Sequence, residues 1–360
     1  MKNLILLYFM LILPFFYGQI KKENKKKCYE KSLTFCKIGD YSPTQTKILN
    51  CNENLEYEER KNKFGENIQL ILSKNGGMPY TGICETCFEN GQREMRLNIK
   101  QGVETGIDTT FYQSGCIMGI RSHIDGIKTG KWSSYYDSTN QLEWELNFKI
   151  ATRKDGLQIT VKNGVHIFIE PNGDTSSLET YQDNLLNGIR KTFYEQGKLH
   201  ELVSYKKGKI DGQYIEYNFN GKVIAKLNFK KGKKDGLNTF YFEDGVILRS
   251  ELWEQNAKNG TFTTYYHEGF IKSTENYKKG LKEGWFEDFY QTRKVHIKSL
   301  YEKDELIEEH EFNEKGKEIR RFPEIEKEEA ETEDDEIEVP TKKGKKEKKE
   351  KKEKKKKEKK

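Results

Sequence analysis

Six cysteines and six histidines are the residues of this 360-residue chain that are best able to carry out chemistry. All the cysteines fall in the first third of the sequence: Cys28, Cys36, Cys51, Cys84, Cys87 and Cys116. An even number of cysteines, in a chain that also carries an export signal, predicts disulfides that staple the amino-terminal region. The spacing does not determine which cysteines pair, so all six are candidate disulfide residues.

A metal site is the alternative interpretation of the closest pair, Cys84-x-x-Cys87. This pair lies on a predicted strand, where residues three apart point to opposite faces of a sheet. The sequence also offers no second Cys-x-x-Cys and no nearby histidine pair to complete a zinc site. We therefore expect no metal ligands and no cofactor.

The histidines do not recur at a common spacing, and they are His123, His166, His200, His267, His296 and His310. The sequence contains no Gly-x-Ser-x-Gly nucleophile elbow, no Walker phosphate loop and no His-Glu-x-x-His zinc motif. Asp-Gly pairs such as Asp211-Gly212 fall in predicted turns, where they serve backbone geometry. These patterns predict a protein that is not an enzyme and has no small-molecule substrate.

Glycine recurs every 24 residues, which is the strongest pattern in the sequence. The leading glycines are Gly82, Gly106, Gly130, Gly164, Gly188, Gly212, Gly236, Gly260 and Gly284, with an insertion of about ten residues between Gly130 and Gly164. When the leading glycine is counted as step 0, further glycines recur at steps 9 and 20. An aromatic pair precedes step 9, and a lone aromatic recurs at step 17, so nine units share one pattern.

Each unit has the pattern of a β-hairpin. A strand of about seven residues runs to the aromatic pair, a tight glycine turn follows, and a second strand of about eight residues ends at the lone aromatic. Because one hairpin is marginal in water, neighbouring hairpins must stack and bury their aromatics against each other. We therefore predict an all-β fold, an elongated antiparallel meander of stacked 24-residue β-hairpin repeats over residues 76–310.

Two segments give the repeat a family resemblance. They are Met78-Pro79-Tyr80-Thr81-Gly82 with Phe88-Glu89-Asn90-Gly91-Gln92, and Gly188 to Lys198 followed by Tyr205-Lys206-Lys207-Gly208. The chain resembles bacterial variant MORN-repeat proteins over residues 76–310, and departs from the pattern at the insertion and after Gly284, where Arg293 and Asp304 replace glycines. The resemblance implies an antitoxin-like protein, or one that binds lipid, associates with itself or acts as a scaffold. It carries over no catalytic residues.

Residues 1–18 have the pattern of a secretory signal peptide. The apolar run from Leu4 to Phe16 is too short for a comfortable membrane span. Cleavage after Gly18 would give an exported protein that is periplasmic, associated with the outer envelope or secreted; the alternative is an uncleaved anchor. Residues 19–75 hold three cysteines and no clear repeat, which predicts an amino-terminal cap over the open sheet edge.

The carboxyl-terminal part changes composition sharply. Residues 311–323 are the end of a degenerate repeat that begins at Glu308 and would form a second cap. Residues 324–340 hold ten acidic residues and one lysine, whereas residues 341–360 hold fourteen lysines and four glutamates. Such blocks predict a disordered tail, which is either simply solvated or an electrostatic tether to an anionic polymer or lipid. Without aromatics for base stacking, it predicts no specific nucleic-acid binding.

The remaining candidates for function are aromatic side chains. Apolar residues make up only 34% of the chain while aromatics reach 12%, a balance that suits a thin sheet whose rings keep one edge in water. Trp132, Trp253 and Trp285 are candidate partner contacts, although aromatics at fixed repeat steps more often form the core.

Together these features favour an exported, non-enzymatic scaffold that binds a protein or an envelope component through its repeat sheet. The alternative is an antitoxin or immunity protein that neutralises a toxin. A further hypothesis is membrane binding through the lysine-rich tail.

Overall fold

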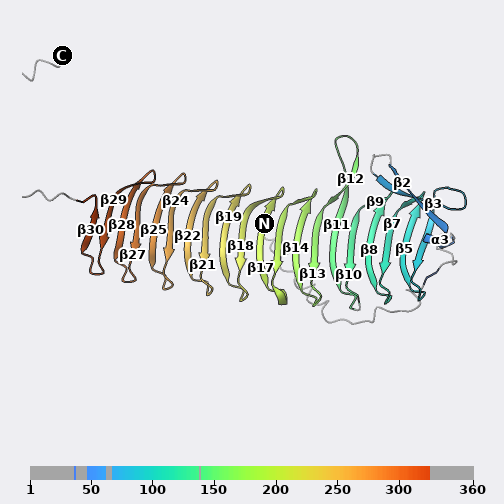
Figure 1. The fold of residues 1–360 in the computed structure, drawn as a ribbon, viewed down its shortest axis with the longest axis horizontal. Coiled ribbons are helices and arrows are strands. Elements are labelled where there is room, and N and C mark those ends of the chain that lie inside the picture. Colours follow the sequence, from blue (N-terminus) through green and yellow to red (C-terminus); the bar gives the residue numbers. More distant parts are fainter. Residues whose placement is uncertain (1–35, 38–46, 62–66, 138, 325–360) are drawn as a thin grey trace, which may run out of the picture.

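The computed structural model describes residues 36–37, 47–61, 67–137 and 139–324. Over these residues the chain forms one long sheet of 28 strands and a separate two-stranded hairpin (Figure 1). Successive strands of the long sheet pair antiparallel with their neighbours along the chain, and only β1 (Leu49–Asn50) pairs in parallel, with β4 (Gly82–Cys87). The predicted all-β antiparallel meander is therefore confirmed. The predicted signal peptide, Cys28 and the acidic and lysine-rich tail beyond Glu324 lie outside the described residues.

The strands follow the chain order across the sheet. The first half comprises β5 (Arg93–Lys100), β6 (Val103–Glu104), β7 (Gly106–Phe111), β8 (Ile117–Ile124), β9 (Ile127–Lys128), β10 (Gly130–Tyr135), β11 (Leu142–Thr152), β12 (Gln158–Lys162), β13 (Gly164–Ile169), β14 (Thr175–Gln182), β15 (Leu185–Leu186), β16 (Gly188–Phe193) and β17 (Leu199–Lys206). The second half comprises β18 (Lys209–Tyr217), β19 (Val223–Lys230), β20 (Lys233–Lys234), β21 (Gly236–Tyr241), β22 (Ile247–Glu254), β23 (Ala257–Lys258), β24 (Gly260–Tyr265), β25 (Ile271–Lys278), β26 (Leu281–Lys282), β27 (Gly284–Phe289), β28 (Val295–Glu302), β29 (Glu305–Phe312) and β30 (Glu318–Phe322).

The repeat register follows the glycine period. In each unit the leading glycine lies directly opposite the residue that sequence analysis placed at step 17, as in Gly188↔Tyr205 and Gly260↔Tyr277. In the third unit Gly130 faces Phe148, one step later. A glycine has no side chain, so the facing ring can lie over the strand, and this explains why the two positions recur together.

The turns at step 19 to step 20 keep their geometry even where glycine is absent. Gly208 and Gly232 have φ of 77° and 83°, and Asn184, Asn256 and Asp304 replace glycine with φ of 68°, 71° and 73°. Asn and Asp tolerate the left-handed region better than other side chains. The array therefore does not fade after Gly284 as the sequence suggested, because β29 and β30 add a further hairpin that ends at Phe322.

The insertion between Gly130 and Gly164 lengthens one hairpin. Strand β11 continues past Phe148 and pairs with β12 from Phe148↔Lys162 to Thr152↔Gln158. This extension projects from the edge of the sheet in Figure 1. The inserted residues therefore leave the stacking of the neighbouring units intact.

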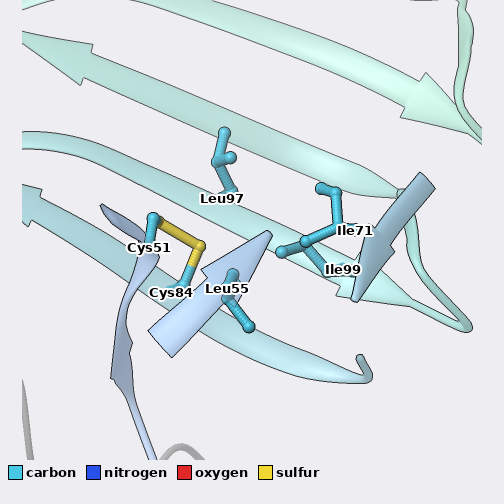
Figure 2. Close-up of a cluster of buried hydrophobic side chains, with 6 residues drawn as sticks. All are labelled: Cys51, Leu55, Ile71, Cys84, Leu97 and Ile99. Atoms are coloured by element: carbon cyan, nitrogen blue, oxygen red, sulfur yellow. A yellow bond between two sulfur atoms is a disulfide. The ribbon is translucent and has the colours of Figure 1, made fainter. Parts of the chain in front are cut away.

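The amino-terminal residues pack on the first repeat. The short helix α3 (Cys51–Asn54) leads into β2 (Leu55–Lys61), which pairs with β3 (Asn67–Ser73). The backbone N–H of Ile71 donates to Gly102 O at 2.7 Å, which joins β3 to the first repeat. The buried cluster that results is shown in Figure 2 and comprises Cys51, Leu55, Ile71, Cys84, Leu97 and Ile99. No helix among the described residues is long and apolar enough to cross a membrane.

Candidate interaction surface

The long sheet has two faces of different chemistry, because side chains alternate along each strand. Steps 2 and 17 of every unit share one face, which we call the ladder face. Steps 1 and 16 share the other, which we call the aliphatic face for its exposed side chains Ile107, Val165, Leu237 and Leu252. From β10 onward, no second layer of described residues covers either face (Figure 1).

On the ladder face, rings from steps 17 and 2 of successive units touch in two continuous rows. The first row joins His123, Trp132, Phe148, His166 and Tyr181, with ring centroids 4.6–6.1 Å apart. The second row joins Trp253, Phe262, Tyr277, Phe286 and Tyr301, at 4.8–5.5 Å. Between the rows, step 2 holds Arg190 and later Asn238 in place of an aromatic side chain.

Lysines at step 22 cover these rings. The Nζ atom of Lys128 lies 3.7 Å from the ring centroid of Trp132 and 3.8 Å from that of Phe148. Lys258 and Lys282 lie in the same way over the rings of the second row. Burial, together with the nearby charges of Arg121 and Lys162, lowers the pKa of Lys128 to about 8. The stacked cations show that the rows form the thin core of the sheet rather than bare aromatic platforms.

Acidic side chains bind the polar edges of the same rings. The Tyr181 hydroxyl donates to Glu179 at 2.9 Å, and the Trp253 indole N–H donates to Glu251 at 2.8 Å. Burial, together with this carboxylate, raises the pKa of Tyr181 to about 12. The ladder face is therefore a network of rings, lysines and acids in which cations cover the rings and carboxylates bind their polar edges.

His166 is the most deeply buried polar member of the ladder. Its side chain is fully buried between Phe148 and Tyr181, and its Nε2 lies 3.0 Å from Asn147 O. A nitrogen that close to a carbonyl carries the proton, which leaves the buried Nδ1 as an acceptor without a hydrogen-bond partner. Burial lowers the pKa of this imidazole, so it is neutral at physiological pH.

Where the second aromatic before step 9 is a tyrosine, it ties one repeat to the next. The hydroxyl groups of Tyr112, Tyr194 and Tyr266 donate to backbone carbonyls of the following unit at 2.9, 3.0 and 2.7 Å. Tyr136 and Tyr290 make the same bond. These tyrosines are inter-repeat clamps along one long edge of the sheet.

Several apolar side chains of the aliphatic face are exposed to solvent. Ile107 is 60% exposed and Leu237 is 53% exposed, and Leu237 lies directly opposite Leu252 on the neighbouring strand. Asparagines at step 16, such as Asn228 and Asn276, donate side-chain hydrogen bonds to the step 1 carbonyl of the next unit. The backbone there is thereby fixed while the side chains at step 1 stay open to solvent.

The three candidate tryptophans do not form one patch. Trp132 and Trp253 lie on the ladder face under the cations of Lys128 and Lys234. Trp285 is at step 1 on the aliphatic face, where Lys298 covers it at 4.3 Å. The two faces were not distinguished from the sequence. Trp285 is at step 1 and Phe286 is at step 2, and neighbouring steps of a strand point to opposite faces.

The cysteines of the described residues are disulfide-bonded. Cys36 pairs with Cys87 and Cys51 pairs with Cys84. Cys116 is disulfide-bonded as well. The two cysteines of the Cys84-x-x-Cys87 pair thus bind different partners, as their opposite directions on one strand require.

Sequence analysis missed one cluster. Glu104, Asp108 and His123 lie on the short strand β6 and on β7 and β8, and their side chains converge on the ladder face. His123 Nδ1 lies 2.7 Å from Asp108 Oδ2 and 3.3 Å from Glu104 Oε2. The signal in the sequence was the exchange of residue types at steps 22, 2 and 17: lysine recurs at step 22 in four other units, and aromatic side chains are common at steps 2 and 17.

The comparisons with known proteins agree with this architecture. Residues 186–207 and 210–231 match the MORN repeat variant, and the two matched units are consecutive. The chain therefore contains MORN-type repeats. The predicted family resemblance is thus confirmed for the repeat type. MORN repeats are commonly protein-binding or membrane-binding motifs and are generally not catalytic.

No curated protein sequence matches the chain. Among solved structures, a Tc holotoxin pore from Photorhabdus luminescens is similar at 10% identity and a TM-score of 0.18. That match covers 76% of this MORN-repeat chain and only 16% of the toxin chain.

Proposed function

We propose that this MORN-repeat protein is an exported, non-enzymatic scaffold that binds a protein partner through the aliphatic face of its sheet. The observation that carries the proposal is the pair Leu237 and Leu252, which lie side by side on adjacent strands and stay exposed. Ile107 and Val165 repeat this exposure in other units. Exposed apolar side chains that lie next to each other and form a contiguous patch are typical of interaction sites.

The chemistry around these residues fits a protein interface. Thr239, Thr261 and Thr263 occupy neighbouring positions of the same face, so apolar side chains alternate with short polar ones. Protein interfaces combine an apolar centre with a polar rim in this way. The ladder face offers less, because its rings are already covered by lysines and bonded to acids.

The proposal is tested by site-specific photo-crosslinking in the native host. A photoreactive residue replaces Leu237 in one variant, and Ile271 in the matched control, which has similar exposure but follows a hairpin turn. We expect a crosslinked species of defined mass from Leu237 and none from Ile271. Equal crosslinking at both positions, or none at either, would exclude the aliphatic face as the binding surface.

Export is tested separately by fractionating the host and measuring the intact mass in each fraction. A mature chain that begins at Gln19 in the envelope or the medium supports the scaffold proposal. A cytosolic protein that keeps residues 1–18 would instead favour the antitoxin alternative. A crosslinked partner that is toxic when expressed alone would do the same.

A further inference from the structure

At three junctions between repeats, three side chains are in contact on the ladder face, namely one lysine and two rings. They come from step 22 of one unit and from steps 2 and 17 of the next. At one junction these are Lys128, Trp132 and Phe148, and at another they are Lys258, Phe262 and Tyr277. In both, a lysine cation lies between two rings. A positive charge at this place is thus a recurring part of the architecture.

At the first junction the same three positions hold Glu104, Asp108 and His123. The cation of step 22 is replaced by a carboxylate, and the two rings are replaced by a second carboxylate and an imidazole. Asp108 is 2% exposed and His123 is 8% exposed, while Glu104 is partly open to solvent. Their donor atoms lie within 4.8 Å of one another.

Inside the cluster, one imidazole nitrogen faces both carboxylates. His123 Nδ1 carries at most one proton, yet Asp108 Oδ2 and Glu104 Oε2 both face that nitrogen. The other Asp108 oxygen accepts from the Asn98 backbone N–H at 2.9 Å, which fixes the carboxylate in place. Burial raises the pKa of Glu104, His123 lowers it, and the Asp108 carboxylate raises it.

Among the described residues, no lysine or arginine forms an ion pair with Glu104 or Asp108. Arg121 is near enough to lower the pKa of Glu104, but its guanidinium lies over the Trp132 ring at 5.4 Å. The Trp132 ring itself packs edge-on against His123 and holds the imidazole in position. The cluster therefore has two carboxylates and one imidazole oriented toward a common point.

We propose that Glu104, Asp108 and His123 bind a divalent transition-metal ion, for which zinc has the best fit. One imidazole nitrogen with two carboxylate oxygens suits zinc, whereas magnesium and calcium prefer oxygen ligands alone. The ion takes the place of the proton on Nδ1, and the imidazole then keeps its proton on Nε2. Zinc distances of about 2.0 Å require the Nδ1 to Oδ2 separation to open to roughly 3.3 Å. Water fills the fourth position on the open side of Glu104.

The test uses the full, oxidised chain without a histidine tag. After chelator treatment, the protein is dialysed against Zn²⁺ and the bound metal is measured, with binding followed by calorimetry. We expect about one zinc ion per chain at this cluster and at least a tenfold loss of affinity in His123→Phe and in Asp108→Asn. The His123→Phe variant keeps an aromatic ring at step 17, next to Trp132, and an aromatic ring occupies step 17 in most other units.

A matched control exists in the last repeats. His310 also contacts two carboxylates, but Glu308 binds its Nε2 and Glu318 binds its Nδ1, so these donors do not converge. His310→Phe should leave zinc affinity unchanged. In the unmodified protein, zinc should shift the ring NMR signals of His123 and not those of His310, a readout that does not depend on how a variant folds. No bound zinc, or a zinc affinity in both cluster variants equal to that of the unmodified protein, would overturn the proposal.

Discussion

Phe262 offers the sharpest test of how the thin sheet is stabilised. Its ring is 1% exposed, although a single-layer sheet has no second layer to cover it. Trp253 and Tyr277 pack edge-on against it from either side, with centroids 5.5 and 5.2 Å away. Lys258 covers it at 5.0 Å. Side chains of the neighbouring strands therefore supply the burial of this core residue.

The expected cost of Phe262→Ala follows from these contacts. Removal of a fully buried phenylalanine costs about 3–5 kcal/mol, and the two edge-on ring pairs contribute about 0.5–1.5 kcal/mol each to that loss. Water can enter the gap in a single-layer sheet, so we expect the lower end, about 3 kcal/mol. Since 1.4 kcal/mol is tenfold, local opening should become roughly a hundredfold more frequent.

Hydrogen exchange read by mass spectrometry measures this effect by segment. In a repeat array each unit contacts only its neighbours, so exchange should accelerate in β22 to β27 and stay unchanged in β7 to β10. The control is Phe219→Ala, because Phe219 is 43% exposed at a hairpin turn and should cost less than about 1 kcal/mol. Equal acceleration over the whole sheet would refute nearest-neighbour stabilisation, and no acceleration would refute the role of Phe262.

Three further predictions follow from the same contacts. Tyr266→Phe removes the hydrogen bond from the Tyr266 hydroxyl to Phe289 O and should lower the free energy of unfolding, measured by urea titration, by about 1 kcal/mol. The control is Tyr265→Phe, which removes no such hydrogen bond and should leave the free energy of unfolding unchanged. The two histidines with shifted pKa values should change the free energy of unfolding with pH in opposite directions. The pKa of His166 is lowered, so its contribution to stability is complete above pH ~6.5 and is lost as the pH falls through the folded pKa. The pKa of His310 is raised by Glu318 and Glu308, so its contribution is complete below pH ~6.5 and is lost as the pH rises through the folded pKa. His166→Phe should therefore flatten the acid side of a stability profile and His310→Phe the neutral side, and identical profiles for both variants would contradict this assignment. Replacement of Cys51 and Cys84 by alanine should cost about 2–4 kcal/mol and accelerate exchange only near the first repeat, while an unchanged exchange pattern there would show that the Cys51–Cys84 disulfide does not stabilise the cap.

The sequence by itself determined the repeat and its strands. Glycine at steps 0 and 20 marks positions where the backbone must admit a facing ring or a left-handed turn, so the period was visible without any structure. The same reasoning failed at Asp304 and Arg293, because both adopt the left-handed conformation that glycine was expected to supply. The glycine pattern alone thus predicts most of the array correctly but places its end too early in the chain.

The tertiary structure alone decided which side chains meet. Trp285 and Phe286 are neighbours in the sequence and lie on opposite faces, so only the register assigns one to the aliphatic face and the other to the ladder. Likewise, His123 meets Asp108 and Glu104 because three strands bring residues 15 and 19 positions away into contact. Hydrophobic period and turn chemistry are local properties of the chain, whereas disulfide partners and ligand clusters depend on pairing between strands, which the local sequence does not encode.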